Sequence, residues 1–436
     1  MDTIEILIPK ILLIVGVSLA ILVGFLLGQY FLKQYEGFET KIKSYKDDPA
    51  YKKQLAALHE RFDPVAGGRR GVVDLLATAA APPLAEQCLV NFYALATRFT
   101  GYIGPFDNGY FDPEEAVSIA MKAGCRTFVL EIDYIETCED AAGKPTYFPK
   151  LVVRDERDRL RTNPLSDEPR CQSIGTSNIT AVAKAIAATA FAQQTQNRDD
   201  PVIIILYGLR IPPKAYALEY MSNIAKCLAP LLDFHVDNLV HGGTFTRQKQ
   251  EGQLLINNIL DYQARVLIFA NMDTSAFRDA PPGKYAPKED LDYLVNLRLT
   301  YKQTQMGCTC PPSGGSYGIL EAADDFLIIP PDRVDETSEE LKLKWTMALS
   351  KDPSQPVTSS TYKAITSKFG VHCVPICLWD TNNTFLYDQT AFKTYSFIPK
   401  PEELRYRKPP IAVPAAPSVA MNANGGALRA PVVGGK

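Results

Sequence analysis

The chain has 436 residues, of which 46% are hydrophobic and 22% are charged, and this composition excludes a wholly disordered protein. Its formal net charge of -3 gives no basis for bulk electrostatic binding, so we expect no nucleic-acid partner. The nine cysteines are odd in number and scattered, which favours reduced, mostly buried thiols in a domain that faces the cytosol.

A long apolar run follows residues 1–10, which form a short N-terminal stub. The run from Ile11 to Leu32 contains no charged residue. About 22 helical residues span a hydrocarbon core of roughly 30 Å. A cleaved signal peptide is the alternative, but its apolar region is about 7–15 residues long and ends at small residues. This run ends in Gln29, Tyr30 and Phe31, so we expect a retained transmembrane helix over 11–32.

Lysines around the apolar run predict its orientation. Only Lys10 lies before the run, whereas six lysines follow within residues 33–53. Positive charge accumulates on the cytoplasmic side of membrane helices. We therefore expect a single-pass protein whose C-terminal domain is cytoplasmic.

Small residues recur at every fourth position of the expected membrane helix. They are Gly16, Ala20, Gly24 and Gly28, and they share one helical face. Such a stripe lets a second helix approach closely, which predicts self-association or pairing with another membrane helix. Chance is the alternative, since glycine and alanine are common in membrane helices.

The segments on either side of the main domain differ from it in composition. Residues 33–85 begin with a charged, helix-compatible stretch and end in small residues over 75–83, which is typical of a linker. Residues 401–436 form a tail that is rich in Pro, Ala, Val and Gly from 409 onward. Such a tail cannot form a core alone, and is either a passive end or an arm that becomes ordered along a partner.

Residues 86–400 alternate between short apolar runs and helical patterns. The expected strands cover 127–132, 202–207, 266–271, 326–329 and 371–378, and the expected helices cover 113–123, capped by Asp112, 178–193 and 213–228. The strands are apolar on both faces, as parallel strands covered by helices are. Repeated strand–helix units predict an α/β barrel, with a doubly wound sheet as the alternative.

Two carboxylates end the first of these strands. Glu131 and Asp133 are two residues apart and therefore point to the same side. Such a pair could hold a hard cation such as Ca²⁺, although we expect no cofactor. The alternative is a pair of ordinary strand-end carboxylates that accept hydrogen bonds from neighbouring loops.

The order of these motifs resembles the catalytic domain of phosphatidylinositol-specific phospholipase C. The resemblance covers about 290 residues and is strongest where Gly124-Cys125-Arg126 leads into Glu131-Ile-Asp133. Weaker parts are the preceding Thr97-Arg-Phe-Thr-Gly-Tyr102 and the strand over 201–206. The resemblance implies a TIM-type barrel with its site at the carboxyl ends of the strands.

The family's two catalytic histidines are missing from the matching positions. The first position aligns with Arg98 or Phe99, and the second falls near Arg154. Arginine stays protonated and phenylalanine has no proton to move, so neither replaces a histidine acid or base. The chain has no histidine between His59 and His235.

Other members of the family's site are also absent. Gly208 stands where the resemblance implies a glutamate, so Glu131 and Asp133 alone remain of the metal ligands. The vestigial site would then consist of Arg98, Glu131, Asp133 and Arg154. The sequence thus resembles a phospholipase C barrel without catalysis, and we expect no catalytic residue.

Two further motifs allow a metal or an acid–base group. Cys308-Thr-Cys310 together with Cys373 and Cys377 suggests zinc, but neither spacing is the usual two-residue knuckle, which favours buried thiols. His241-Gly-Gly-Thr suggests a displaced acid–base group, with a polar turn as the alternative.

An anchor, a rigid barrel and an extended arm are what a protein needs to tie a membrane to a protein layer. We therefore expect a non-catalytic scaffolding protein whose partners are a lipid bilayer and other structural proteins. An anchored barrel of this kind resembles minor capsid proteins of large DNA viruses with an internal membrane, which would place it in a virion.

Two other functions stay open from the sequence. A lipid phosphodiesterase with relocated catalytic groups would place His235 or His241 within hydrogen-bond reach of Glu131 or Asp133. A catalytically dead headgroup-binding module would gather Arg98, Arg126 and Arg154 in one pocket.

Overall fold

The computed structural model describes residues 22–26, 45–62, 69–105, 109–139, 145–154, 160–161, 174–236, 253–301, 317–352, 355, 357–381 and 391–408. The chain divides into two compact units, Met1–Tyr406 and Arg407–Lys436. The backbone amide of Tyr406 donates to Asn91 Oδ1 over 2.6 Å, which attaches the end of the first unit to the start of the main domain. The expected arm over 409–436 lies outside the described residues.

The expected membrane helix over 11–32 also lies outside the described residues, apart from a helical turn over 22–26. Gly16, Ala20 and Gly28 of the small-residue stripe lie outside them too, while Gly24 has no atom within 4 Å of where a Cβ would stand. No helix among the described ranges has the length and apolar character needed to cross a bilayer.

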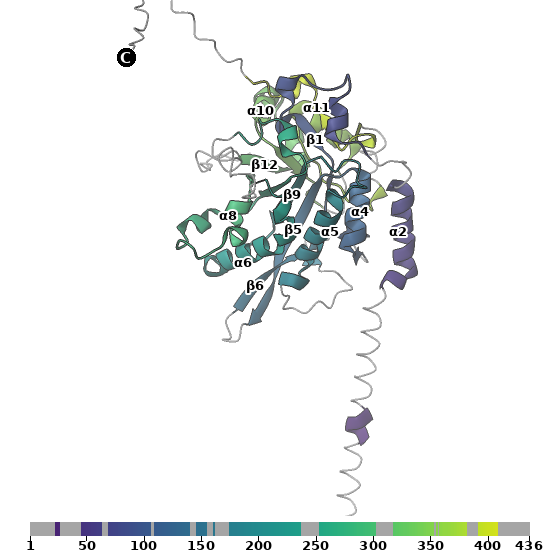
Figure 1. The fold of residues 1–436 in the computed structure, drawn as a ribbon, viewed down its shortest axis with the longest axis vertical. Coiled ribbons are helices and arrows are strands. Elements are labelled where there is room, and N and C mark those ends of the chain that lie inside the picture. The colour runs from purple at the N-terminus through teal and green to yellow at the C-terminus, as the bar shows by residue number, and fades with distance from the viewer. Residues whose placement is uncertain are drawn as a thin grey trace, which may run out of the picture. The chain divides into compact units, whose positions relative to one another are not determined.

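A curled parallel sheet forms the centre of the domain (Figure 1). Its strand order is β13-β12-β11-β10-β9-β5-β2, with neighbouring strands parallel. The strands are β2 (Ala96–Thr97), β5 (Thr127–Glu139), β9 (Val202–Gly208), β10 (Val266–Ala270), β11 (Leu297–Tyr301), β12 (Tyr317–Ala322) and β13 (Thr346–Leu349). Residues 373 and 376 bridge the two edge strands in parallel, through Met347↔Cys373 and Thr97↔Ile376. The expected mixed α/β fold with a curled parallel sheet is confirmed.

Antiparallel pairs surround this sheet. β6 (Pro145–Leu151) pairs with β5 and extends it as a ribbon beyond the sheet (Figure 1). The remaining pairs are β1 (Phe92–Ala94) with β14 (Phe397–Pro399), β3 (Tyr102–Ile103) with β4 (Tyr110–Phe111), and β7 (Val153–Arg154) with β8 (Leu160–Arg161).

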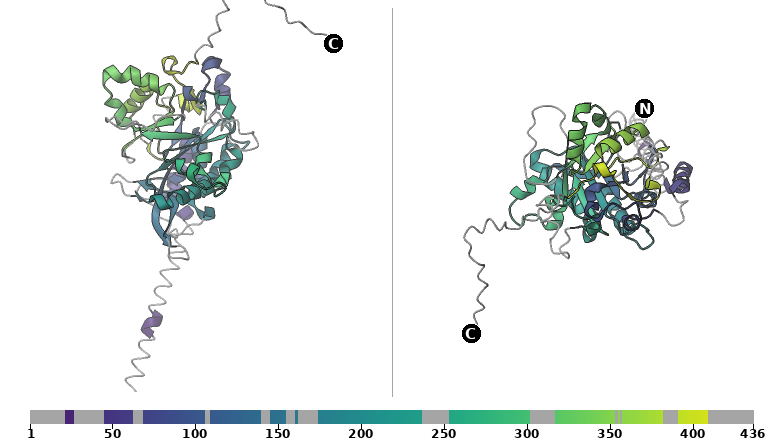
Figure 2. Two further views of the ribbon diagram at one scale, coloured as in Figure 1. Left: turned by 90° about the vertical axis from the view of Figure 1, so that its left-hand side faces the viewer. Right: turned by 90° about the horizontal axis from the view of Figure 1, so that it is seen from above.

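Helices pack on the outer face of the sheet (Figure 1 and Figure 2). They are α2 (Pro49–Phe62), α4 (Pro113–Ala123), α5 (Asn178–Ala190), α6 (Lys214–Cys227), α8 (Leu291–Leu294), α9 (Ala323–Leu327), α10 (Val334–Leu341) and α11 (Ser359–Phe369). Helix α3 (Val72–Leu76) instead buries Val72 and Leu75 in a separate cluster of apolar side chains. Asp112 caps α4 as expected, since its side chain accepts from the amide of Glu115 over 3.2 Å. Gly124 ends α4 with a φ of 89°, a left-handed conformation that suits glycine.

The strand expected over 326–329 is wrong, because these residues follow β12 as part of α9 and the turn after it. Phe326 packs its ring 5.6 Å from that of Phe369, so its apolar character reflects a helix contact. The run over 371–378 forms only isolated bridges, and Pro375 in its middle cannot donate to a ladder.

Side chains of each strand alternate between two buried clusters. Phe128, Leu130 and Ile132 of β5 belong to the outer cluster, which includes the helices. Val129 of β5 belongs to the inner cluster, with Ile205 of β9. By the same alternation, Glu131 and its register partner Tyr207 lie on the inner face, at the carboxyl ends of their strands.

A lysine is buried near the inner cluster. Lys400 is 1% exposed, and its Nζ has no hydrogen-bond partner within the described ranges. Burial lowers the pKa of Lys400 well below its usual value. The unfolded chain therefore binds this proton at pH values where the folded chain does not, and the free energy of unfolding rises with pH toward about 10.

We expect Lys400→Met to raise the free energy of unfolding at pH 7 by roughly 1–3 kcal/mol, because the apolar side chain needs no hydrogen bond. The variant should also lose the rise of stability between neutral pH and about pH 10. Urea unfolding at several pH values measures both effects, with Lys368→Met, an exposed lysine, as the matched control. A destabilised Lys400→Met would show that the amine has a polar partner.

Candidate functional site

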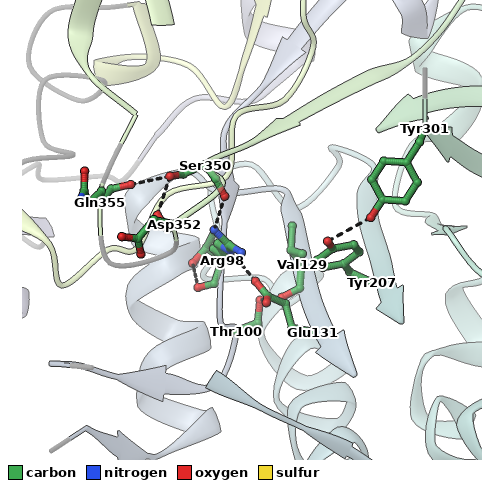
Figure 3. A network of polar contacts seen from close by, with 10 residues as sticks. Arg98, Thr100, Val129, Glu131, Tyr207, Tyr301, Ser350, Asp352 and Gln355 are labelled. Atoms are coloured by element: carbon green, nitrogen blue, oxygen red, sulfur yellow. Dashed lines mark hydrogen bonds and ion pairs between the residues drawn. The ribbon is translucent and has the colours of Figure 1, made fainter. Parts of the chain in front are cut away.

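Polar side chains of several strands meet on the inner face at the carboxyl edge of the sheet (Figure 3). Arg98 follows β2, Glu131 lies in β5, Tyr207 lies in β9 and Tyr301 ends β11. The hydroxyl groups of Tyr207 and Tyr301 lie 3.2 Å apart. In barrels of parallel strands the carboxyl edge is where ligands bind, so this cluster is the candidate site.

A buried ion pair forms the centre of this cluster. The Nε of Arg98 donates to Glu131 Oε1, and its Nη1 donates to the carbonyl of Ser350 over 3.4 Å (Figure 3). Arg98 is 5% exposed and Glu131 is 1% exposed. Burial lowers the pKa of Arg98, but the Glu131 carboxylate outweighs it and leaves this pKa above its usual value. Arg98 therefore stays charged and tied to Glu131.

Backbone and ring contacts hold Arg98 in this position. Its guanidinium lies 4.9 Å from the ring centroid of Phe99, which suits a cation–π contact. Phe99 is buried and has a φ of 52°, a left-handed conformation that is rare for a bulky residue. The ring of Phe99 stacks on that of Trp379 with centroids 6.2 Å apart. The pair is thus supported by a packed aromatic layer.

Asp133, two residues further along β5, is paired with a different arginine. The Nε of Arg210 donates to Asp133 Oδ1 over 2.8 Å and to Oδ2 over 3.0 Å. The Arg210 guanidinium also lies 4.5 Å from the ring centroid of Tyr134. Asp133 is 1% exposed, whereas the side chain of Arg210 is 47% exposed. Each carboxylate of the expected metal pair therefore contacts a cation.

At Gly208, where the family resemblance implies a glutamate, other side chains lie close to the backbone. A Cβ on Gly208 would lie 2.7 Å from Met272 Cγ and 2.8 Å from Met272 Sδ. The side chain of Asn271 accepts from the Gly208 amide over 2.7 Å and donates to its carbonyl over 3.0 Å. A side chain at position 208 would therefore require Met272 to shift. Arg154 lies in β7, and its side chain is outside the described residues.

Two of the three described histidines, His235 and His372, contact other parts of the fold. The Nε2 of His235 lies 2.8 Å from the Leu294 carbonyl, at the amino end of β10. His372 accepts at Nδ1 from the Thr346 amide over 3.0 Å, and its Nε2 lies 2.6 Å from the Val90 carbonyl. Burial, followed by Lys400, lowers the pKa of His372 well below its usual value. His235 therefore lies at the opposite edge from Glu131, and His372 is a neutral, buried ring.

Neither of the other two histidines, His59 and His241, is placed at the candidate site. His59, in α2, lies 3.5 Å from Glu115 of α4, on the outside of the sheet. His241 lies outside the described residues.

Arg126 lies at the opposite end of β5 from the candidate site. Its Nη1 donates to the Ala190 carbonyl over 3.0 Å, and its Nη2 donates to Asn197 Oδ1 over 2.9 Å. Burial lowers the pKa of Arg126 to about 10. Residue 126 precedes β5, whereas Arg98 contacts Glu131, roughly 16 Å further along the strand. The expectation that Arg98 and Arg126 converge in one pocket is therefore wrong.

Four cysteines allowed a zinc site as an alternative to buried thiols, and the two that the structure describes are buried free thiols. Cys373 and Cys377 belong to the inner and the outer cluster, respectively. Burial raises the pKa of both thiols. Cys308 and Cys310 lie outside the described residues. Within the described ranges, no three His, Cys, Asp or Glu side chains form a group that could hold a metal ion.

Comparison with known proteins gives matches to solved structures only. No family model and no curated protein matches the chain. PLC21 of L. pealei shares 15% identity over 75% of this chain, with a TM-score of 0.45, and PLC21 of S. officinalis shares 14% over 76%, with a TM-score of 0.43. The chain covers 39% of each of these two proteins.

A third similar structure is the calcium-dependent phosphoinositol-specific phospholipase C of a Pseudomonas species. It shares 12% identity over 72% of this chain and 96% of its own length, with a TM-score of 0.41. Likeness at this level says nothing of substrate or activity.

Proposed function

We propose that this chain is a non-catalytic, membrane-anchored structural protein that links a membrane to a protein layer, as a minor capsid protein does. Its main domain would be a phospholipase C-like barrel without the catalytic groups. The observation that supports this proposal is the buried Arg98–Glu131 ion pair at the carboxyl edge. The apolar run over 11–32 supplies the anchor in this proposal.

The chemistry of the pair argues against catalysis at this edge. A general acid or base must gain and lose a proton near the working pH, and an arginine held above its usual pKa does neither. The Glu131 carboxylate is 1% exposed, its Oε1 accepts from Arg98 and its Oε2 is buried, so neither oxygen is open to a substrate.

The same pairing argues against a calcium site. Ca²⁺ binds through about six to eight oxygen ligands, and an arginine on a carboxylate competes with it for those oxygens. Arg98 and Arg210 already contact Glu131 and Asp133. We therefore expect millimolar CaCl₂ or EDTA to leave the melting temperature of the full chain unchanged. A calcium-dependent rise in the melting temperature, which tight binding to the folded state would cause, would contradict this expectation.

A turnover assay tests the absence of catalysis. The full chain, reconstituted in vesicles that contain phosphatidylinositol, should release no inositol phosphate above vesicles alone, with or without Ca²⁺. Because His241 lies outside the described residues, the assay includes His241→Ala as a matched variant. Release by the original chain that His241→Ala abolishes would establish a relocated active site and overturn the proposal.

A further inference from the structure

Two segments from near the two ends of the main domain meet ahead of β9. Residues 70–72 lead into α3, and residues 394–396 lead into β14. Arg70 and Tyr395 form a parallel bridge. The Arg70 amide donates to the Thr394 carbonyl over 2.9 Å, and the Ser396 amide donates to the Arg70 carbonyl over 3.1 Å. These bonds join the segment that enters the domain to the segment that leaves it.

One buried carboxyl group fastens both segments. Asp200, which precedes β9, is fully buried, and its Oδ1 accepts from the Val72 amide over 2.7 Å. Its Oδ2 is hydrogen-bonded to the hydroxyl of Ser396, which is also fully buried. A Cβ on Gly71 would lie 2.6 Å from Asp200 Oδ1, so glycine lets the backbone come this close. We name Asp200 and residues 70–72 and 394–396 the clasp.

The hydrogen bonds of the clasp require one more proton than an ionised Asp200 supplies. The Ser396 hydroxyl lies within hydrogen-bond distance of two acceptors, Asp200 Oδ2 and the Arg70 carbonyl, the latter at 3.1 Å. A hydroxyl group has one proton to donate. It therefore satisfies the Arg70 carbonyl only if a protonated Asp200 donates to the Ser396 oxygen. When Asp200 is ionised, the hydroxyl donates to the carboxylate and the Arg70 carbonyl loses this donor.

The surroundings of the clasp keep this proton in place on the acid side of neutrality. Burial raises the pKa of Asp200 to about 6, while Arg126, ahead of β5, opposes the rise and Asp199 adds to it. Arg69 is buried against the end of α4, Arg70 is exposed, and the second segment contains no charged residue. Between about pH 4 and pH 6 the closed clasp therefore holds a proton that an open, solvated Asp200 would release.

We propose that a single proton on Asp200 closes the clasp, so that the two ends of the main domain are tied together in mildly acidic conditions and separate more readily at neutral pH. The clasp acts on the connection between the two ends and leaves the central sheet folded. This inference goes beyond the proposed function, because it holds whether or not the chain has a membrane anchor.

Hydrogen exchange of the full chain at pH 5 and pH 7.5 reports local opening of the clasp. Protection is measured for peptides that cover 70–72 and 394–396, and for β10 as a reference for global unfolding, after correction for the intrinsic effect of pH on exchange. We expect protection of both clasp peptides to fall about tenfold between the two pH values and to lie below that of β10 at neutral pH. Clasp peptides as well protected as β10, or unchanged between the two pH values, would overturn the inference.

A variant that cannot ionise assigns the effect to the proton. Asp200→Asn keeps an acceptor for the Val72 amide and adds an N–H donor to the Ser396 oxygen, so it imitates the protonated clasp. We expect it to retain at neutral pH the protection that the original chain has in acid. Asp261→Asn, at an exposed aspartate, is the matched control and should keep the fall in protection. An Asp200→Asn clasp that still loses protection as the pH rises would overturn the inference.

A second variant tests the hydrogen-bond chain separately. Ser396→Ala removes the hydroxyl between Asp200 and the Arg70 carbonyl, so the protonated carboxyl has no acceptor there. We expect protection of the clasp in acid to fall to the level that the original chain shows at neutral pH. Protection that stays at its original level in acid would contradict the hydrogen-bond chain.

Discussion

Arg98→Met is expected to lower the free energy of unfolding by about 3–5 kcal/mol, because it leaves a buried carboxylate without its cation. Glu131 is 1% exposed, and its Oε2 already has no hydrogen-bond partner among the described residues. Loss of Arg98 Nε would leave the Glu131 carboxylate with no donor among the described residues. Urea unfolding of the full chain measures the effect.

A double variant that removes both charges distinguishes the contribution of the ion pair to stability from that of side-chain packing. Arg98→Met/Glu131→Leu replaces the pair with apolar side chains of similar size, and we expect it to recover most of the lost stability. Arg278→Met is the control, since Arg278 pairs with Asp292 at the surface and its side chain is 69% exposed. That variant should cost at most about 1 kcal/mol. A double variant no more stable than Arg98→Met would show that the two residues do not act as a pair.

Asp200→Asn is expected to remove a fall in stability between about pH 4 and pH 6. Asp200 is fully buried before β9, where it accepts from the Val72 amide over 2.7 Å and from the Ser396 hydroxyl. Burial raises its pKa to about 6, although Arg126 opposes the rise. The folded chain therefore binds this proton more tightly than the unfolded chain does, and the stability from that proton is lost as the pH rises through 6.

The raised pKa corresponds to roughly 3 kcal/mol between the two ends of this range. Asparagine keeps an acceptor for the Val72 amide and cannot ionise, so the variant should show a flatter pH profile. Asp200→Ala is the contrasting variant and should lose about 1–3 kcal/mol at every pH, because the buried Val72 amide then has no acceptor. An Asp200→Asn profile parallel to that of the original chain would contradict the assignment of this titration to Asp200.

The strands that could be predicted from the sequence are the ones that are apolar on both faces. VIIILY and VLIFA read as buried strands and form β9 and β10. LRLTY, YGILEA and TMAL mix polar, small and apolar residues, and only pairing with neighbours across the sheet makes them β11, β12 and β13. The capped helix α4 was predictable because its signals, Asp112 and Gly124, are local.

The candidate site was predictable in part for the same reason. The two carboxylates that end the strand were found from the sequence, and both Glu131 and Asp133 are buried. Their partners come from distant segments, since Arg98 precedes β5 by one helix and Arg210 follows β9. Sequence spacing carries no signal for such contacts. The hydrogen bond from Tyr51 to Asp112 was unpredictable in the same way, because the two residues are 61 residues apart.

Crosslinking mass spectrometry on the native, membrane-bound chain tests the structural role most directly. We expect reproducible crosslinks from the main domain and from residues 409–436 to one abundant coat or shell protein, at a fixed stoichiometry. A membrane-bound chain of low abundance that has no fixed partner would contradict the structural role.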